Sequence, residues 1–415
     1  LQRSTMSKQK KKYISYKKKK FNIGKLLIAQ SLKMIKQSKR PLILIGNGVK
    51  LSKTTQLIKN FIKKNNLPYA CTWGITDLFD SNDMLNAGSF GVAASRYGNF
   101  TLQQSDLLLC LGMRLSAQIV GGDPKKFSPN SKKILVDIDN NEFKSHRLPK
   151  INLKINANIK DYINSLNKKK LNLDKKGISN WIKKIKYLKK NFPILSKKNY
   201  VSEHYVDPYY FFHRLSNFIK ANSILIPDAS ANLIWTYQAF KVLKKLNIFT
   251  AFNHSPMGYS LAASVGAYLG SKKKLVTAII GDGSVPMNVQ ELETIKHHNV
   301  NVKIFVINNK GYTLIKQTQE TWLGSRYAGV DKSSGLSLPD NCKIAESYGI
   351  KSITIVNNKD VNSKLKTIYK KKGPLLIDVR VNPKSRVAPK IDFGKPLHDM
   401  SPRLPSTIIE NMMKN

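Results

Sequence analysis

Acidic residues and cysteine are both scarce in this chain of 415 residues. It has 25 aspartates and glutamates against 71 lysines and arginines, and only 3 cysteines. Cys71, Cys110 and Cys342 stand far apart and match no metal-binding spacing. We therefore expect neither a disulfide framework nor a zinc module, and the cysteine usage predicts a reducing, cytoplasmic setting.

Long apolar runs are missing as well. No segment approaches the roughly 20 apolar residues that span a bilayer, and the basic N-terminus is not followed by the apolar stretch of a secretory signal. Glycine and proline are at ordinary levels, which excludes collagen-like and proline-rich classes. A hydrophobic fraction of 41% is enough for real cores. The length predicts two to three domains, and we expect no association with a membrane.

The formal net charge of +46 would suit a protein that binds nucleic acid or an anionic surface. The excess is mostly lysine, however, and it accompanies abundant asparagine and isoleucine, as strongly A/T-rich coding would produce. The lysines are spread along the chain and no nucleic-acid-binding motif is recognisable. We therefore expect a solvated basic surface and no nucleic-acid partner, while a basic nucleic-acid-binding protein remains the weakest alternative.

The first half of the chain shows an alternation of strands and helices. Residues 1–21 are basic, without any acid, and are expected to be a linker or tail. Residues 22–165 follow a βαβ pattern, which predicts a Rossmann-like domain with a parallel sheet covered on both faces. Its strands are expected at residues 41–45, 68–72, 107–111 and 134–138, with a helix over residues 51–64.

The second half repeats this pattern after a lysine-rich segment. Residues 166–204 are expected to form a surface helix that links two domains. The alternating strand and helix patterns of residues 205–395 predict a second α/β domain, and residues 396–415 are expected to be a tail. The expected strands are 223–227, 248–252, 275–280, 302–307, 352–355 and 375–381, and the expected helices are 208–220, 258–269, 286–297 and 341–348. The predicted fold class is α/β, with two doubly wound parallel-sheet domains.

Two short motifs stand at the ends of two of these strands. Gly281-Asp282-Gly283-Ser284 follows one strand, and Asn308-Asn309-Lys310-Gly311 follows the next strand along the chain. Parallel strands end at the same edge of a sheet, where α/β folds bind ligands. Asp282 and Asn309 offer the oxygen atoms that Mg²⁺ prefers, and the glycines and Ser284 suit a nearby phosphate. The pair of motifs predicts a metal-bound diphosphate, whereas GDG alone would equally suit a plain turn.

The spacing of these motifs resembles the thiamine diphosphate (ThDP) fingerprint of the pyruvate decarboxylase and acetohydroxyacid synthase superfamily. The resemblance implies that Asp282, the side chain of Asn309 and the carbonyl of Gly311 bind Mg²⁺. Met257, in the segment NHSPMGYSLAASVG, matches the apolar residue that supports the bent cofactor, although a core methionine is the alternative. Asn232, in DASANLIW, matches the first turn that contacts the diphosphate, and Gly281, Gly283 and Ser284 complete the cofactor-binding set.

The resemblance covers roughly residues 38–405. PLILIGNGV, GSFGVAASRYG, DLLLCLGMRL and ILVDIDNNEF resemble the central domain of the family, and KPLHDMSPRLP resembles the tails of acetolactate-synthase-like proteins. The family also has a preceding pyrimidine-binding domain, which carries the glutamate that activates the cofactor. This chain shows no counterpart, so we expect a fragment whose catalytic glutamate lies elsewhere. Glu291 and Glu293, on the helix after GDG, are interpreted as structural.

The resemblance implies a 2-oxo acid as the small-molecule substrate, decarboxylation followed by carboligation, and a homo-oligomer with active sites between subunits. Two departures concern the reaction. Thr318 stands near the position of a tryptophan that shapes the second-substrate site of acetohydroxyacid synthases. Residues 116–122 differ from the stretch typical of FAD-containing synthases, which leaves FAD doubtful. The alternative function is a non-catalytic remnant of a ThDP enzyme, or a partner subunit of one.

Overall fold

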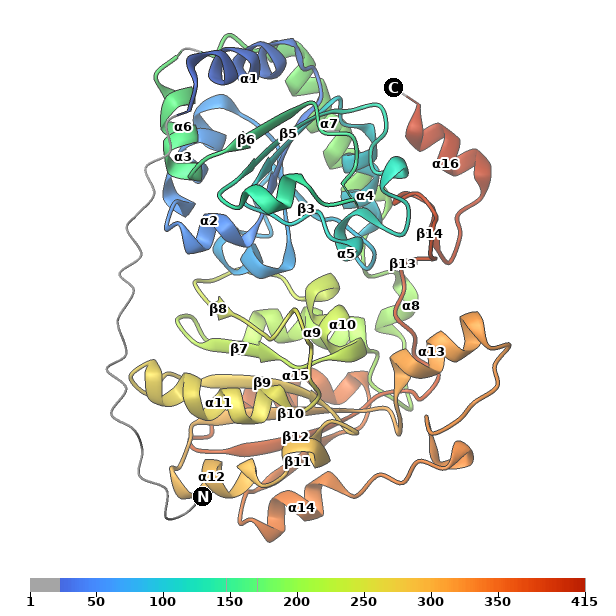
Figure 1. The fold of residues 1–415 in the computed structure, drawn as a ribbon. Helices are drawn as coiled ribbons and strands as arrows, with labels where there is room; N and C mark the ends of the chain where they lie inside the picture. The colour runs from blue at the N-terminus through green and yellow to red at the C-terminus, as the bar shows by residue number, and fades with distance from the viewer. Residues whose placement is uncertain (1–22, 147, 170, 415) are drawn as a thin grey trace, which may run out of the picture.

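The computed structural model describes residues 23–146, 148–169 and 171–414, so the predicted basic segment 1–21 lies outside the described residues. Two α/β domains follow one another along the chain, each built around a six-stranded, all-parallel sheet (Figure 1). This confirms the predicted fold class. Among the described residues, no helix is both long enough and apolar enough to cross a bilayer.

The first sheet has the strand order β3-β2-β1-β4-β5-β6. Its strands are β1 (Pro41–Ile45), β2 (Tyr69–Cys71), β3 (Asn86–Ser89), β4 (Leu107–Leu111), β5 (Lys132–Asp137) and β6 (Leu153–Asn156). Strand β1 is buried throughout, because Ile43 and Ile45 pack on one face of the sheet while Leu42 and Leu44 pack on the other. A continuous apolar run is what a sheet covered on both faces requires.

Helices cover both faces of this first sheet. One face packs against α1 (Lys25–Gln37), α3 (Thr55–Asn65) and α6 (Ile159–Asn167). The other face packs against α4 (Arg96–Gln104) and α7 (Lys175–Asn191). Shorter pieces lie in the connections: α2 (Asn47–Leu51), η1 (Trp73–Leu78), α5 (Ala117–Val120), η2 (Pro124–Lys126), η3 (Asn140–Phe143) and, after α7, α8 (Lys197–Tyr200).

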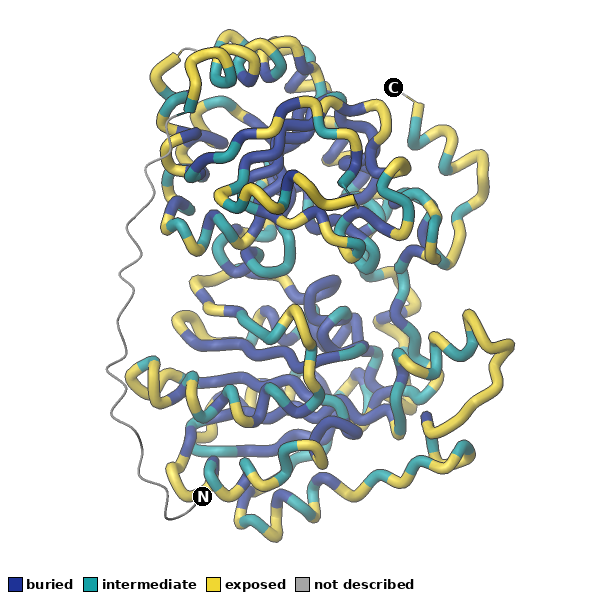
Figure 2. The backbone as a smooth tube through the Cα atoms, viewed as in Figure 1, coloured by how far each residue is buried: buried dark blue, intermediate teal, exposed yellow. Residues whose placement is uncertain are grey.

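The second sheet has the order β11-β12-β10-β9-β7-β8. Its strands are β7 (Ile224–Pro227), β8 (Asn247–Ile248), β9 (Val276–Gly281), β10 (Val302–Asn308), β11 (Ser352–Ile355) and β12 (Leu375–Arg380). Helices α9 (Pro208–Phe218), α10 (Ser230–Ala239) and α15 (Asn358–Ile368) cover one face. Helices α11 (Tyr259–Gly270), α12 (Glu291–His297) and α14 (Asn341–Ser347) cover the other. Figure 2 shows both sheets as buried layers between more exposed helices.

Further pieces complete the second half: η4 (Val285–Asn288), α13 (Thr313–Trp322) and η5 (Lys332–Ser334). The predicted strands form, although the one expected over residues 248–252 is only Asn247–Ile248. The helix expected over residues 51–64 is interrupted because Lys53 takes a φ of 56°, which ends α2 and lets α3 begin at Thr55. The helix expected over residues 286–297 divides into η4 and α12, and α10, α13 and α15 were not predicted.

The sequence predicted that the segment containing α7 is a surface helix linking two domains. In the structure, α7 also covers one face of the first sheet. Its apolar stripe, which includes Trp181 and Ile185, is buried in the core of the first domain, and the indole Nε1 of Trp181 donates to the carbonyl of Pro41 at 3.1 Å. Most lysines of this helix are exposed, whereas Lys184 and Lys189 are half-buried. Because the helix is amphipathic, it buries one side against the sheet and cannot act as a free surface linker.

The C-terminal segment returns from the second domain to the first. It contains β13 (Lys390–Ile391), β14 (Met400–Ser401) and α16 (Ser406–Met413), which lies beside the first domain in Figure 1. Ile391, Leu397 and Met400 are buried in the same core as Leu42 and Leu44. The tail predicted over residues 396–415 is therefore partly a structural element of the central domain.

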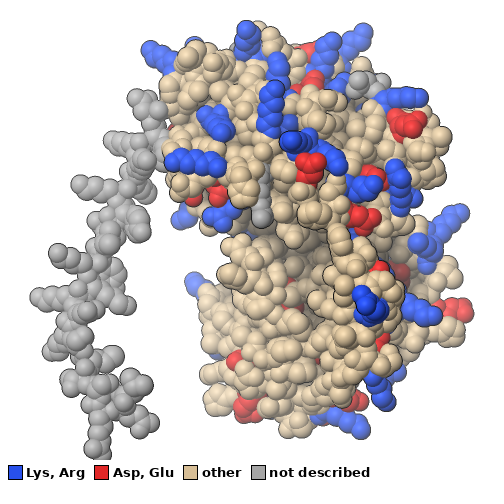
Figure 3. All heavy atoms as spheres, turned by 45° about the vertical axis from the view of Figure 1, so that its right-hand side comes forward, with Lys and Arg blue, Asp and Glu red and all other residues tan. Residues whose placement is uncertain are grey.

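Basic side chains are spread over the visible face of both domains and are mixed with acidic ones (Figure 3). This distribution matches the expectation of a solvated basic surface. Few of the described lysines and arginines are buried. Burying a charged side chain lowers the free energy of unfolding, and this loss can be measured.

Lys133, on β5, is a buried lysine whose effect on stability can be measured. Its side chain is buried, its Nζ donates to the carbonyls of Ser128 and Ser131, and burial lowers its pKa from 10.5 to about 8. The folded protein therefore releases this proton at a lower pH than the unfolded chain. Between about pH 8 and about pH 10 we expect the wild type to gain about 2 kcal/mol of unfolding free energy relative to Lys133→Met. Urea unfolding of both proteins at the two pH values measures the gain, and parallel changes would contradict it.

Candidate cofactor site

The candidate site lies where the connections of the second sheet diverge. Strand β7 is flanked by β8 on one side and by β9 on the other, so the chain leaves β7 and β9 in opposite directions. In open α/β sheets, this switch in strand order opens a crevice at the carboxyl ends of the strands. Asp228 follows β7, Asp282 follows β9, and Asn309 and Gly311 follow β10. The structure thus brings the two sequence motifs to one edge.

Three polar groups of the predicted metal ligands meet at this edge. The amide N–H of Asn309 donates to Oδ1 of Asp282 at 3.3 Å and to the carbonyl oxygen of Gly311 at 2.7 Å, while its oxygen accepts from the hydroxyl of Thr313. Mg²⁺ in an octahedral site holds neighbouring oxygens about 2.9 Å apart. A half-turn of the amide would turn its oxygen toward the same point as these two oxygens. These three groups, called here the oxygen cluster, can therefore present their oxygens to one cation, and hydrogen bonds join them otherwise.

Asp282 carries the only side-chain charge of this oxygen cluster. It is 3% exposed, and burial raises its pKa from 3.8 to about 7, although backbone N–H groups of Gly283, Lys310 and Gly311 act in the opposite direction. A buried carboxylate is stabilised in its charged form by a nearby cation. Within the described residues, no group of three or more His, Cys, Asp or Glu side chains could hold a metal. One carboxylate, one amide and one carbonyl remain a suitable set for Mg²⁺, which also takes phosphate oxygens and water.

The position of the Gly311 carbonyl is fixed by a segment that the sequence analysis did not single out. Gly311 forms an antiparallel bridge with Asp331, and a Cβ on Gly311 would lie 2.2 Å from the carbonyl oxygen of Val330. Asp331 in turn pairs with Lys316 on α13, and this contact holds the pKa of Asp331 well below its usual range. Residues more than ten positions downstream thus position a predicted ligand, and no local sequence signal shows this.

The predicted diphosphate contacts face a common space beside the oxygen cluster. A Cβ on Gly281 would lie 3.4 Å from Nδ2 of Asn232 and 3.6 Å from Oγ of Ser284. Asn232 is buried in the first turn of α10, and its Oδ1 has no hydrogen-bond partner. Helix N-termini favour anions, and Ser230 enters this helix with a φ of 66°. The unused polar groups here match a site that is completed by a polar ligand.

Gly283 has a second constraint besides the predicted approach of a phosphate. A Cβ at this position would lie 2.2 Å from the ring of Tyr312, the residue after the predicted ligand Gly311. The aromatic ring therefore packs directly on the GDG turn. Tyr312 could not be predicted from the sequence, because nothing in the motif spacing distinguishes a ring that packs against the turn from an ordinary helix cap.

Asp228 organises the approach to Met257. Its carboxylate accepts hydrogen bonds from the backbone N–H groups of Gly258 and Ser260, both at 3.1 Å, and burial raises its pKa. This fixes the start of α11, which Gly258 enters with a φ of 87°. Met257 is half-buried and lies outside the four hydrophobic cores of the described residues. That placement favours a ligand-facing role over the core methionine considered as the alternative.

Two family models match the chain. Residues 228–379 match the model described as thiamine pyrophosphate enzyme, C-terminal TPP binding domain, and residues 28–166 match the thiamine pyrophosphate enzyme central domain. Thiamine pyrophosphate is another name for ThDP. This chain belongs to the thiamine pyrophosphate enzyme family. The central-domain match contains the whole first sheet, and the C-terminal match covers most of the second sheet, with β7 just before it. The C-terminal match contains every predicted cofactor and metal residue.

Within this family, the chain is similar to several acetolactate synthases. The chain is 30% identical to the acetolactate synthase large subunit of Cyanidium caldarium, over 88% of this chain and 61% of the relative. It is also 30% identical to the large subunit of Porphyra purpurea, over 90% and 62%. Acetolactate synthase 2, chloroplastic, of Nicotiana tabacum is 28% identical over 91% and 57%. The resemblance seen in the sequence is confirmed, and the chain spans about three fifths of the length of these relatives.

Proposed function

We propose that this chain is the ThDP- and Mg²⁺-binding part of an enzyme that decarboxylates a 2-oxo acid and joins the remaining fragment to an acceptor, as an acetolactate synthase does. The meeting of the Asp282 carboxylate, the Asn309 amide and the Gly311 carbonyl, inside the family's TPP binding domain, is the observation that carries the proposal. The names of the relatives support the choice of reaction.

Each predicted residue has a role that its surroundings support. Asp282, Asn309 and Gly311 would hold Mg²⁺, and Asn232 and Ser284 would contact the diphosphate. Met257 would support the organic part of the cofactor. When bound, ThDP supplies the carbanion chemistry, and the protein supplies position and electrostatics.

The nearby acids Glu291 and Glu293 lie in the first turn of α12, where acidic side chains complement the helix dipole. We assign neither of them to the chemistry. The activating glutamate implied by the family has no counterpart in the two matched segments, so we propose that a further domain or a subunit contributes it. A homo-oligomer with active sites between subunits remains part of this proposal.

The test uses the protein isolated from its natural source, with whatever domains or subunits accompany this chain. Supplied with Mg²⁺ and ThDP, it is expected to release CO₂ from pyruvate and to form acetolactate. Mass spectrometry of the products separates the two steps. CO₂ without a ligated product would overturn the carboligation, and pyruvate that stays intact would overturn the enzymatic proposal as a whole.

A further inference from the structure

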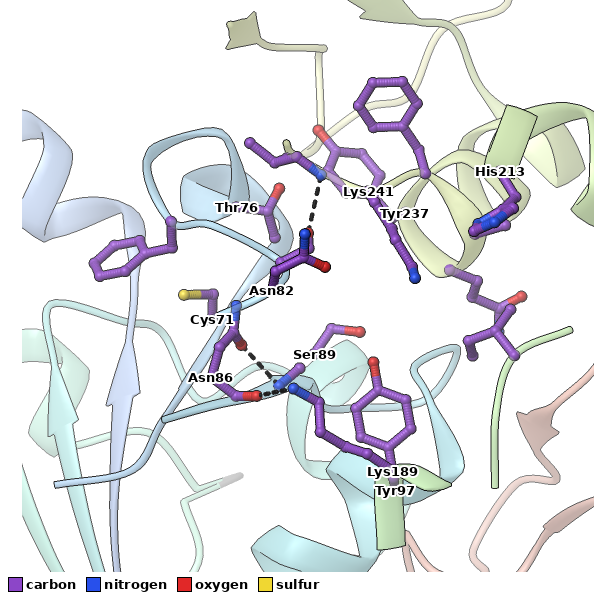
Figure 4. A pocket seen from close by; sticks show the side chains of 18 of the residues that line it. Cys71, Thr76, Asn82, Asn86, Ser89, Tyr97, Lys189, His213, Tyr237 and Lys241 are labelled. Carbon is purple, nitrogen blue, oxygen red and sulfur yellow. Dashed lines mark hydrogen bonds between the residues drawn. The ribbon is translucent and has the colours of Figure 1, made fainter. Parts of the chain in front are cut away.

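A second cavity, separate from the cofactor crevice, lies between the two domains. It has a volume of about 580 Å³ and is lined by the β2–β3 region of the first domain, by α7, and by residues of α9 and α10 from the second domain (Figure 4). None of the predicted metal or diphosphate ligands lines it, and neither does the Gly46–Gly48 turn. The volume is within the range of about 300–1,000 Å³ that is typical of small-molecule sites.

Hydrogen bonds between the domains hold the wall of this cavity. The backbone N–H of Val242 donates to the hydroxyl of Ser81 at 2.9 Å, and the N–H of Ser81 donates to the carbonyl of Val242 at 3.0 Å. Nearby, the buried carboxylate of Asp77 accepts from the N–H of Ile248 in the second domain and pairs with Lys50 in the first. The cavity is therefore a built feature of the domain interface, and a ligand bound in it would contact both domains.

The charge of the lining is strongly unbalanced. Lys186 and Lys189 come from α7 and Lys241 follows α10, whereas Asp83 is the one acid among the described residues that lines the cavity. His213, on α9, also lines it, and burial lowers the pKa of its imidazole. Figure 4 shows Lys189 and Lys241 reaching the cavity from opposite walls, one from each domain. Asp83 compensates only part of this charge, since it is one carboxylate beside three lysines, and its oxygens also accept from the hydroxyl of Tyr69 and the N–H of Leu85, both at 2.9 Å.

The cationic groups have donors to spare. Among the described residues, none of the three lysines forms a salt bridge. Lys189 Nζ makes one hydrogen bond, to the carbonyl of Asn86 at 2.6 Å, and burial lowers its pKa. Nδ1 of His213 is buried without a partner. An abundance of surface lysine explains the exposed Lys186 and Lys241, but it does not explain Lys189, which is half-buried, lies over the ring of Tyr97 at 6.0 Å and has no carboxylate partner within the described part of the chain.

The uncharged part of the lining is aromatic. Phe79 and Tyr97 lie in the first domain, Tyr200 in the connection, and Tyr237 and Phe240 in the second domain. No arginine among the described residues lines the cavity, so these residues do not offer the planar two-point recognition of a carboxylate. Lysine binds phosphate as a point charge, and aromatic walls suit a flat or apolar organic group.

We propose that the interdomain cavity binds a small organic phosphate, whose phosphate is held by Lys189 and Lys241 and whose organic part packs on the aromatic walls. The ligand would join the two domains, because one lysine comes from each. This site is independent of the cofactor crevice, and the proposal stands whether or not the chain is catalytic.

Calorimetric titration of the full chain with adenosine monophosphate tests the proposal, since this probe has both a dianionic phosphate and a flat ring. The titration is done without Mg²⁺ and at about 0.15 M salt, where contributions from distant surface charges are screened. We expect saturable binding that Lys189→Ala and Lys241→Ala each weaken roughly 10-fold or more, as the loss of a charge-assisted hydrogen bond predicts.

Lys190→Ala is the matched control, because Lys190 neighbours Lys189 on α7, is exposed and does not line the cavity. It removes the same charge and is expected to leave the affinity unchanged. Lys241 is exposed, so Lys241→Ala also guards against a folding defect in Lys189→Ala. Equal weakening by Lys190→Ala would show unspecific attraction to a basic protein and overturn the proposal. The proposal would also be wrong if Lys189→Ala and Lys241→Ala both bound the probe as tightly as the wild type, or if the wild type did not bind it.

The same experiment separates this site from the proposed cofactor site. Asp282→Asn, in the crevice, is expected to leave binding of adenosine monophosphate unchanged. Loss of probe binding in that variant, with both cavity variants intact, would place the probe in the crevice and refute the second site. Loss of ThDP binding alone would concern only the proposed function.

Discussion

Asp282→Asn is expected to lower the Mg²⁺-dependent affinity for ThDP by more than about 100-fold. Substituting a residue that only orients a metal ligand already lowers metal affinity about 10–100-fold, and Asp282 is proposed to bind the metal directly. The substitution keeps the shape of the side chain but removes the charge of the oxygen cluster formed with Asn309 and Gly311. Calorimetric titration with ThDP, in the presence and absence of Mg²⁺, measures the effect. The wild type should show strong binding only with the metal.

The same variant carries its own control for folding. Burial raises the pKa of Asp282 from 3.8 to about 7. Above about pH 7, ionising this carboxyl is therefore less favourable in the folded protein than in the unfolded chain, which lowers the free energy of unfolding. At about pH 8 without Mg²⁺, Asp282→Asn should therefore be more stable than the wild type, by up to about 4 kcal/mol. A variant that binds poorly because it is misfolded would be less stable instead.

Asp340→Asn is the matched control for binding. Asp340 caps α14 in the same domain by accepting from the N–H groups of Cys342 and Lys343, and asparagine caps helices equally well. It should bind Mg²⁺ and ThDP as the wild type does. If Asp282→Asn binds ThDP normally, or if both variants lose affinity together, the assignment of Asp282 as a metal ligand is wrong.

The strands and the site motifs were the predictable part of this molecule, for a physical reason. Strands buried on both faces must be continuously apolar, so PLILI and LLLCL can be recognised in the sequence and form β1 and β4. Parallel strands end at one edge, so the polar motifs after β9 and β10 could be placed together without knowing the fold in detail. The convergence of Asp282 and Asn309 follows from those two facts.

The unpredicted features depend on contacts between distant segments. Whether α7 links two domains or covers a sheet depends on which surface its apolar stripe meets, and its own sequence does not specify that surface. Tyr312 packs on Gly283, and Asp331 fixes Gly311, through contacts made by the chain after β10. The interdomain cavity likewise combines residues from α7, α9 and α10, and no linear motif records such a combination.

The C-terminal segment supplies the second large effect. Removal of residues 391–415 is expected to unfold the central domain, or to lower its melting temperature by more than about 10 °C. The deletion takes Ile391, Leu397 and Met400 out of the core around Leu42 and Leu44. Each buried apolar side chain of this size contributes roughly 2–5 kcal/mol, so three together are comparable to the whole stability of a domain. Thermal unfolding followed by circular dichroism measures the loss.

A shorter deletion, of residues 404–415, separates packing from chain length. It removes α16, which has no buried residue, and leaves the three core side chains in place. We expect little change in melting temperature. At single positions, Leu397→Ala should cost about 2–5 kcal/mol and Ile408→Ala, on the exposed helix, less than about 0.5 kcal/mol. If the two deletions lowered the melting temperature equally, α16 itself would stabilise the central domain. The prediction that Ile391, Leu397 and Met400 provide this stability would then be wrong.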